Sequence, residues 1–342
     1  MDIASAVVRR VPCILRAHYS TTARRVVLPY LTGAAYTGLQ SAVQTKMLDF
    51  IRRRLDELVT GFFLLLAAIV TVLDPPVFAT RGGLLLARVV LWSAAALVVV
   101  LFAAARVSQH ARNLWRMGGD IGPMAVAVIG YVGLKLLHAS AITAWLGIPS
   151  FDRGMMAADV ALFGKTPYLW FNHWGLDSGL FPRTMSGFYA LYPLTPLLAV
   201  GWFMLKRDRE QFRLVRRALI LSLYCGYCVY LLIPVSGPLS LLGSRSPNFL
   251  ESTRIYSFLA DNFRYRYDCF PSLHTANPWL IVWLSRGKLP RWLMGAAIVV
   301  CCGITLSTVA LQVHYGVDDL AGFAWVFLVA PLARLSLPRT RA

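Results

Sequence analysis

Charged residues are scarce in this sequence. Asp, Glu, Lys and Arg together make up 15% of its 342 residues, whereas hydrophobic residues make up 57% and the mean hydropathy is +0.59. Soluble domains carry about 25% charged residues, which cover the surface that water contacts. So low a share of charged residues excludes an ordinary soluble domain. Several apolar stretches approach the roughly 20 residues that a bilayer needs, which predicts a multi-pass membrane protein.

Acidic residues are the scarcer of the two charged types. The chain has 16 Asp and Glu against 34 Lys and Arg, which gives a net charge of +18. In a membrane protein, Lys and Arg collect in cytoplasmic loops and against anionic lipid, so this excess does not require a nucleic-acid partner. We therefore expect membrane lipids as partners and no nucleic acid.

Cysteines are few, and their spacing argues against a metal site. Of the six, Cys225 and Cys228 form the Cys-x2-Cys pair, but they lie inside an apolar segment with no second pair at ligand spacing. A structural zinc site needs four ligands, and no disulfide framework is visible. We expect no metal and no cofactor.

The N-terminal segment, residues 1–56, lacks the apolar block and small-residue cleavage site of a secretory signal. It holds eight arginines against three aspartates. An acid-poor start of this kind is typical either of an organelle transit peptide or of a cytoplasmic tail on anionic lipid, and both interpretations stay open.

Apolar segments of helical length recur along the chain and predict an all-α fold, a bundle of about eight transmembrane helices. The expected spans are residues 58–73, 84–105, 121–146, 184–205, 218–233, 272–284, 292–313 and 317–335.

Basic residues separate these spans in pairs, which sets the expected orientation. They concentrate in residues 1–56, 106–116, 206–217, 286–291 and 334–341, with two spans between each basic segment and the next. By the positive-inside rule all five segments are cytoplasmic. Both termini are then cytoplasmic, and the loops 74–83, 148–183 and 235–271 face outward.

Two histidines and an aspartate carry the predicted chemistry. His314 and Asp318 are four residues apart, so on one helix they share a face, and the carboxylate can fix the imidazole tautomer and strengthen the other nitrogen as a nucleophile. His274 precedes them by 40 residues, across an apolar segment that enters the membrane and returns. This arrangement predicts phosphoryl transfer: His314 attacks phosphorus, Asp318 orients it, and His274 protonates the leaving alcohol.

These motifs resemble those of the type 2 phosphatidic acid phosphatase (PAP2) superfamily. The run Pro271-Ser272-Leu273-His274 is similar to its motif Pro-Ser-x-His, and Ser307, His314 and Asp318 match the spacing of Ser-Arg-x5-His-x3-Asp. Thr308 at the Arg position and Phe270 before the first motif resemble the inositol-phosphorylceramide synthase branch.

The resemblance implies a domain organisation. It predicts a basic cytoplasmic segment at 1–56, two extra transmembrane helices within 57–119, a catalytic membrane domain with a six-helix core at 120–335, and a basic tail at 336–342. It also implies a phosphohistidine intermediate and a lipid phosphate or phospholipid substrate.

The cations that clamp phosphate in this family do not have their usual positions here. Leu239 follows Gly-Pro where the branch carries a basic residue, and the Lys-x6-Arg-Pro motif is absent. Candidates for the missing charge are Lys135, Arg264 and Arg266; Lys135 either serves the phosphate or snorkels to the outer interface. Ser272 and Ser307 are expected to help to hold the phosphate.

The outer loop 148–183 is rich in aromatic residues, as expected at the headgroup boundary. Its apolar spacing predicts a short interfacial helix, which is either a scaffold or a lid over the lipid substrate.

Three functions remain open at this stage. The first is a lipid phosphotransferase, in which a lipid hydroxyl resolves the phosphohistidine; the second is a phosphatase, in which water does so. The third is a non-enzymatic transporter or scaffold, although no internal repeat with broken helices is visible. The expected location is the bacterial inner membrane with the site on the extracytoplasmic side, an organelle membrane being the alternative.

Overall fold

The computed structural model divides the chain into two compact units, residues 1–52 and 53–342. In the first unit it describes helical residues between 45 and 51, and all elements named below belong to the second. The described residues are 45, 47–48, 50–51, 54–65, 108–136, 140, 143–144, 146–171, 179–242 and 265–335.

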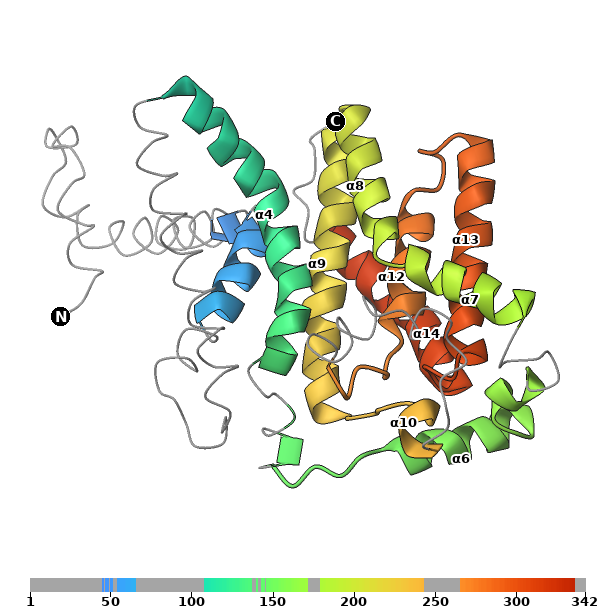
Figure 1. Ribbon diagram of the computed structural model, residues 1–342. Coiled ribbons are helices and arrows are strands. Elements are labelled where there is room, and N and C mark those ends of the chain that lie inside the picture. The colour runs from blue at the N-terminus through green and yellow to red at the C-terminus, as the bar shows by residue number, and fades with distance from the viewer. Residues whose placement is uncertain are drawn as a thin grey trace, which may run out of the picture. The chain divides into compact units, whose positions relative to one another are not determined.

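Every regular element in the described part of the chain is a helix, which confirms the all-α prediction for that part (Figure 1). Residues 54–65 are also helical. The labelled elements are α4 (Gln109–Leu136), α6 (Asp152–Phe163), η3 (Pro167–Trp170), α7 (Leu180–Leu191), α8 (Leu194–Leu205), α9 (Arg209–Leu232), α10 (Pro238–Leu242), α12 (Leu273–Leu284), α13 (Arg291–Ala310) and α14 (Gly316–Leu335).

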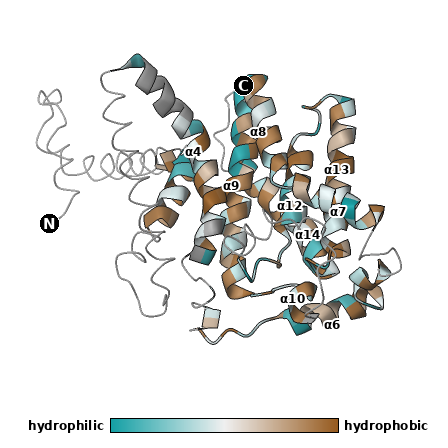
Figure 2. Cartoon of the chain, in the orientation of Figure 1, coloured by the Kyte–Doolittle hydropathy of each residue, from teal (hydrophilic) through white to brown (hydrophobic). Residues whose placement is uncertain are grey.

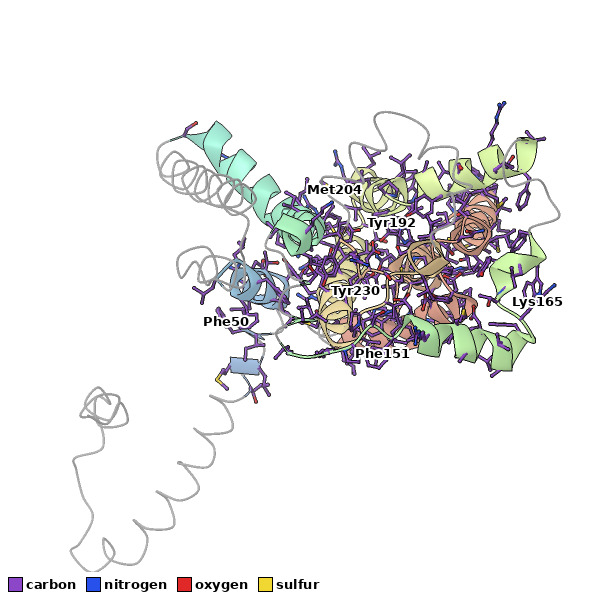
Figure 3. All side chains as sticks on the ribbon, turned by 60° about the horizontal axis from the view of Figure 1, so that its bottom comes forward. Phe50, Phe151, Lys165, Tyr192, Met204 and Tyr230 are labelled. Atoms are coloured by element: carbon purple, nitrogen blue, oxygen red, sulfur yellow. The ribbon has the colours of Figure 1, made fainter. Side chains whose placement is uncertain are left out.

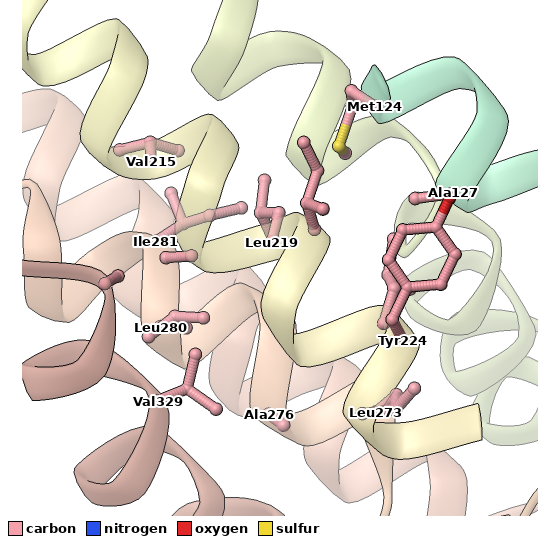
Figure 4. Close-up of a cluster of buried hydrophobic side chains, with 14 of the residues drawn as sticks. Met124, Ala127, Val215, Leu219, Tyr224, Leu273, Ala276, Leu280, Ile281 and Val329 are labelled. Carbon is pink, nitrogen blue, oxygen red and sulfur yellow. The ribbon is translucent and has the colours of Figure 1, made fainter. Parts of the chain in front are cut away.

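The short helix α12 is the centre of the bundle and packs against α8, α9, α13 and α14. Nine of its twelve residues are buried, as expected for a helix that is hydrophobic around its whole circumference. Figure 4 shows Ala276, Leu280 and Ile281 of α12 packed with Leu219 of α9 and Val329 of α14. Because α12 also carries His274, the best-packed part of the protein holds a predicted catalytic residue.

Three described helices are long and apolar enough to cross a membrane: α9, α13 and α14. Helices α7 and α8 make a fourth if they are counted as one span bent by 45°. Figure 2 shows hydrophobic residues along α9 and α13, as expected for helices that contact lipid. The chain therefore has the helices of a membrane protein.

Eight spans and a six-helix core are not confirmed. The expected span 272–284 corresponds to α12, which at twelve residues is about 18 Å long and does not cross a 30 Å hydrocarbon layer. The expected span 84–105 and most of the 57–119 segment lie outside the described residues. The remaining domain boundaries stay predictions.

Helix α6 lies across one end of the bundle, below α12 and α14 in Figure 1. Phe151 and Lys165 flank it in Figure 3. Its C-terminus is closed by Gly164 in the left-handed conformation, whose N–H binds the carbonyl of Val160. The expected short helix in the loop 148–183 is therefore present.

Buried charges join three helical segments near the start of α9. Asp56 is 1% exposed, and its carboxylate lies 2.6 Å from the Arg216 guanidinium and 2.7 Å from that of Arg217. Arg216 also donates to the carbonyl oxygen of Asp120 in α4 at 2.7 Å. Two cations sharing one carboxylate are tolerable in an apolar interior because each is hydrogen-bonded.

Replacing Asp56 by Asn should strongly destabilise the protein. The substitution leaves two buried guanidinium groups without their carboxylate, so the free energy of unfolding should fall by about 3–5 kcal/mol. Unfolding in detergent, followed by heat or denaturant, measures this. The matched control is Arg54→Ala, since Arg54 pairs with Glu57 at 3.7 Å on the surface and such pairs contribute little. Equal effects of the two substitutions would contradict the prediction.

Candidate active site

His274 lies in the first turn of α12, and the end of that helix fixes its place. Ser272 is the N-cap residue, and its hydroxyl accepts from the backbone N–H of Thr275 at 3.3 Å. The imidazole is half-buried between two tyrosine rings of the α7–α8 segment. Its ring centroid lies 4.9 Å from that of Tyr189 and 4.2 Å from that of Tyr192. These rings restrict where the imidazole can lie.

His314 lies in the turn between α13 and α14. The carbonyl oxygen of Thr308 accepts from the backbone N–H groups of Val313 and His314 at 2.9 and 3.1 Å, which closes the turn against the end of α13. The imidazole is 1% exposed. A rigid backbone and a buried ring together allow this side chain little freedom to reorient.

The two histidines and Asp318 form a line. His274 Nδ1 lies 3.1 Å from His314 Nε2, and His314 Nδ1 lies 3.5 Å from a carboxylate oxygen of Asp318. That carboxylate oxygen also accepts from the backbone N–H of Tyr315 at 2.9 Å. The structure therefore brings together all three residues that the sequence predicts to be catalytic, although their roles stay predictions.

The contact between the histidines leaves no room for phosphorus. A nucleophile stands about 3 Å from the atom that it attacks, and a proton donor stands about 2.8 Å from the leaving oxygen. Both separations must fit between nitrogens that are now 3.1 Å apart. If His314 attacks phosphorus and His274 Nδ1 donates the proton, as the sequence predicts, the two rings have to move apart when a substrate binds.

Acidic side chains raise the basicity of His314. Burial by itself lowers the pKa of this imidazole, but the Asp318 carboxylate, 3.5 Å from Nδ1, and the charges of Asp319 and Asp268 raise it, and the net pKa lies above the usual value for histidine. A more basic imidazole is a better nucleophile when it is neutral.

The position of Asp319 at the start of α14 suggests only a helix-start role, but its contacts give it a further one. It is 5% exposed, and its carboxylate is 2.7 Å from the Thr275 hydroxyl and 2.9 Å from the Thr308 hydroxyl. Thr308 occupies the family's Arg position. In this chain that position therefore binds a carboxylate of α14.

The two predicted phosphate-binding serines already have partners in the protein. The Ser272 hydroxyl caps α12, and the Ser307 hydroxyl donates to the carbonyl oxygen of Ile304 at 2.6 Å. Both residues are fully buried. The described contacts thus give each serine a structural role, and phosphate binding by either stays a prediction.

The three predicted cations have different positions. Lys135 is in the last turn of α4, one turn after Tyr131, whose hydroxyl donates to Asp268 at 2.5 Å, so this end of α4 lies beside the segment that leads to His274. Arg266 is exposed, and its guanidinium stacks over the Tyr267 ring. Arg264 lies outside the described residues.

A metal ion has one candidate set of ligands in the described part of the chain: Cys269, His314 and Asp318, whose ligand atoms lie within 4.8 Å of one another. The set includes the predicted nucleophile and its orienting carboxylate. A metal ion bound there would compete with the pairing of His314 and Asp318.

Sequence reasoning missed four residues around the site. Tyr189 and Tyr192 are three apart on an apolar helix, a spacing that also fits ordinary core packing. Asp152 and Asp159 are seven apart, and both are buried. Acidic residues are rare in this chain, and a helix that only lies at the membrane interface does not need two carboxylates on one face. The spacing of Asp152 and Asp159 by two helical turns was therefore the signal in the sequence that could have identified them.

Comparison with known proteins gives one match. A family model described as the PAP2 superfamily matches residues 153–332. No curated protein and no solved structure matches the chain significantly.

The basicity of His314 gives a prediction for pH dependence. His314 must be neutral to attack, so kcat/KM should fall as the pH drops through its raised pKa. In Asp318→Asn the carboxylate that raises this pKa is lost, so the acidic limb should move to lower pH. Turnover should also fall by about 10²- to 10⁴-fold, because the imidazole loses its partner. A pH–rate profile measures both changes, and an acidic limb that stays in place would contradict the assignment.

Proposed function

The chain belongs to the PAP2 superfamily, whose model covers 180 of its 342 residues, and from this premise we propose that it is a membrane lipid phosphotransferase. Members of this superfamily are generally phosphatases or phosphotransferases acting on lipid phosphates. The proposed reaction transfers a phospho-headgroup from a phospholipid to a lipid hydroxyl, as inositol-phosphorylceramide synthases do.

The observation that carries the proposal is the line of His274, His314 and Asp318. One imidazole nitrogen faces the other at 3.1 Å, and the second nitrogen of His314 faces a buried carboxylate. The three side chains that could serve as nucleophile, orienting group and proton donor are thus adjacent, and binding of a substrate would have to separate the two imidazoles.

The proposed reaction has two halves. In the first, His314 Nε2 forms a bond to phosphorus, the bond from phosphorus to the lipid alcohol breaks, and His274 gives its proton to the departing oxygen. In the second, an acceptor hydroxyl attacks the phosphohistidine, His274 takes the hydroxyl proton, and the nitrogen–phosphorus bond breaks. The enzyme returns to its first state without a cofactor.

A cavity of about 320 Å³ supports a lipid as substrate. It lies between η3 and the helices α12, α13 and α14, two of which are candidate spans, and it extends to Asp319, the neighbour of Asp318. Its walls are almost entirely apolar and rich in aromatic rings, a surface that suits an acyl chain. The lining residues are Phe163, Pro167, Trp170, Phe171, Trp279, Cys302, Thr305, Leu306, Val309, Gly316, Asp319 and Phe323.

The transferase is favoured over the phosphatase by Thr308 and Phe270, which resemble the inositol-phosphorylceramide synthase branch. Family membership alone supports both activities equally. We further propose that Lys135 supplies positive charge to the phosphate and that the site faces the extracytoplasmic side. The basis for that side is the distribution of Lys and Arg among the loops.

A phosphohistidine trapped on the protein is the direct test of the mechanism. With a phospholipid donor, rapid quenching should trap acid-labile, base-stable phosphate on the wild-type protein and none on His314→Ala. His274→Ala should slow the cleavage of a natural lipid but spare an activated nitrophenyl phosphodiester, whose leaving group needs little protonation. Labelled phosphate that persists in His314→Ala would overturn the assignment, and so would a His274→Ala defect that is the same for both substrates.

The acceptor is tested by following the products. Purified protein in detergent with a phospholipid donor and a lipid alcohol should form a new phospholipid, which mass spectrometry detects, and little free phosphate or free headgroup phosphate. Release to water with no new lipid would replace the transferase with the phosphatase. A protein that gives neither product but contains bound metal or haem would favour the non-enzymatic alternative.

A further inference from the structure

Helix α6 directs two buried carboxylates at the loops that carry the site. Asp152 is 3% exposed and Asp159 is fully buried. They are seven residues apart, which is two helical turns, so they lie on the same face of α6. Burying a carboxylate is costly unless it is hydrogen-bonded. Both of these are, and their partners belong to two separate segments of the chain.

Asp159 binds the start of α14. Its carboxylate accepts from the backbone N–H of Gly316 at 3.1 Å and from that of Val317 at 2.8 Å. The first N–H groups of a helix have no partner within the helix, so Asp159 caps α14 from another part of the chain. His314 precedes this capped pair by two residues, and Asp318 follows it directly. The cap therefore lies between the predicted nucleophile and its orienting carboxylate.

Asp152 binds a second loop and ties it to the same turn. Its carboxylate accepts from the backbone N–H of Ser236 at 3.1 Å, from that of Gly237 at 2.9 Å and from the Ser236 hydroxyl at 2.8 Å. The hydroxyl of Tyr315, the residue after His314, donates to it at 3.3 Å. Ser150 is a further donor. The backbone N–H groups of Ser236 and Gly237 are therefore already bound to Asp152.

Close packing holds the Ser236–Gly237 loop against the His314 turn. Gly237 has a φ of +87°, and a Cβ atom on it would lie 2.2 Å from the carbonyl oxygen of Val313, the residue before His314. The backbone N–H of Leu239 donates to the carbonyl of Gln312 at 3.1 Å. No side chain can be added at Gly237 without moving the turn that holds the nucleophile.

We propose that Asp152 and Asp159 are positioning residues of the phosphoryl transfer, acting through the His314 turn and without touching the substrate. The proposal rests on the proposed function. Their bonds to backbone N–H groups are charge-assisted and stronger than neutral ones, so they fix both sides of the turn. A displacement of about 1 Å in a catalytic group can lower a rate by 10²-fold, which makes such fixing important for turnover.

A purely structural role is separated from positioning by a matched control. Asp208 also caps a long helix, since its carboxylate accepts from the backbone N–H of Gln211 at 3.0 Å at the start of α9. It belongs to the end of α9 that carries Arg216 and Arg217, and it makes none of the contacts of the His314 turn. Replacing Asp208 removes a cap and leaves that turn unchanged.

The experiment compares Asp159→Asn with Asp208→Ala. An Asn amide can accept from only one of the two N–H groups and points a donor at the other. The first turn of α14 should therefore be held less tightly. We expect kcat to fall by about 10- to 10²-fold in Asp159→Asn with KM changed by less than about 2-fold, and phosphohistidine to form more slowly. Asp208→Ala, which removes the capping acceptor of α9, should lower the unfolding temperature and leave kcat unchanged. Asp152→Asn should resemble Asp159→Asn.

A second variant decides the question if Asp159→Asn does not fold. A Cβ atom on Gly316 would lie 2.7 Å from Pro167 Cγ and 2.8 Å from Phe163 Cε2, so Gly316→Ala should push α6 and η3 away from α14 while keeping the carboxylate. It should show the same loss of kcat at nearly constant KM.

The possible results distinguish a failure of the positioning role from a failure of the proposed function. Wild-type kcat in Asp159→Asn or in Gly316→Ala would overturn the positioning role, as would an equal loss of kcat in Asp208→Ala. A wild-type protein without turnover, or full turnover in His314→Ala, would instead overturn the proposed function.

Discussion

A polar site inside an apolar bundle depends on one constraint, that each buried polar group must be hydrogen-bonded by the protein itself. Around α12 the constraint is met by a chain of contacts between helices. The indole N–H of Trp325 donates to the Ser222 hydroxyl at 3.1 Å, Ser222 donates to the Asn277 side-chain oxygen at 2.6 Å, and the Asn277 amide donates to the Tyr192 hydroxyl at 3.1 Å. The ring of Tyr192 then packs on His274. The central helix is thus fixed to α14, α9 and the α7–α8 segment by polar contacts as well as by packing.

The same constraint explains why α6 belongs to the catalytic domain although it does not cross the membrane. The ends of α14 and the loop before α10 expose backbone N–H groups at the base of the bundle, where α6 and η3 exclude water. Asp152 and Asp159 supply the acceptors. Their cost of burial is offset by seven donors from the protein, so the interfacial helix is held in place by polar contacts to the site as well as by apolar packing.

Patterns within short stretches of the sequence predicted those parts of the structure that depend on short stretches of chain. Apolar runs located α9, α13 and α14, and the motif spacing identified the two histidines and Asp318, because both signals lie within short stretches of chain. The contacts that hold the site are not local. Asp152 meets Tyr315 across 163 residues, and Asp159 meets Gly316 across 157. Nothing in one sequence links such positions.

The direct contact between the two imidazoles has a consequence for the resting protein. Between His274 Nδ1 and His314 Nε2, which are 3.1 Å apart, there is space for one proton and for no other atom. The lone pair that would bond to phosphorus is occupied by its neighbour while no lipid is bound. In the proposed mechanism, the nitrogen that attacks phosphorus is therefore masked at rest by the neighbouring ring. Only a ligand whose binding energy separates the rings exposes it, so the energy of holding the lipid chain also activates the reactive atom.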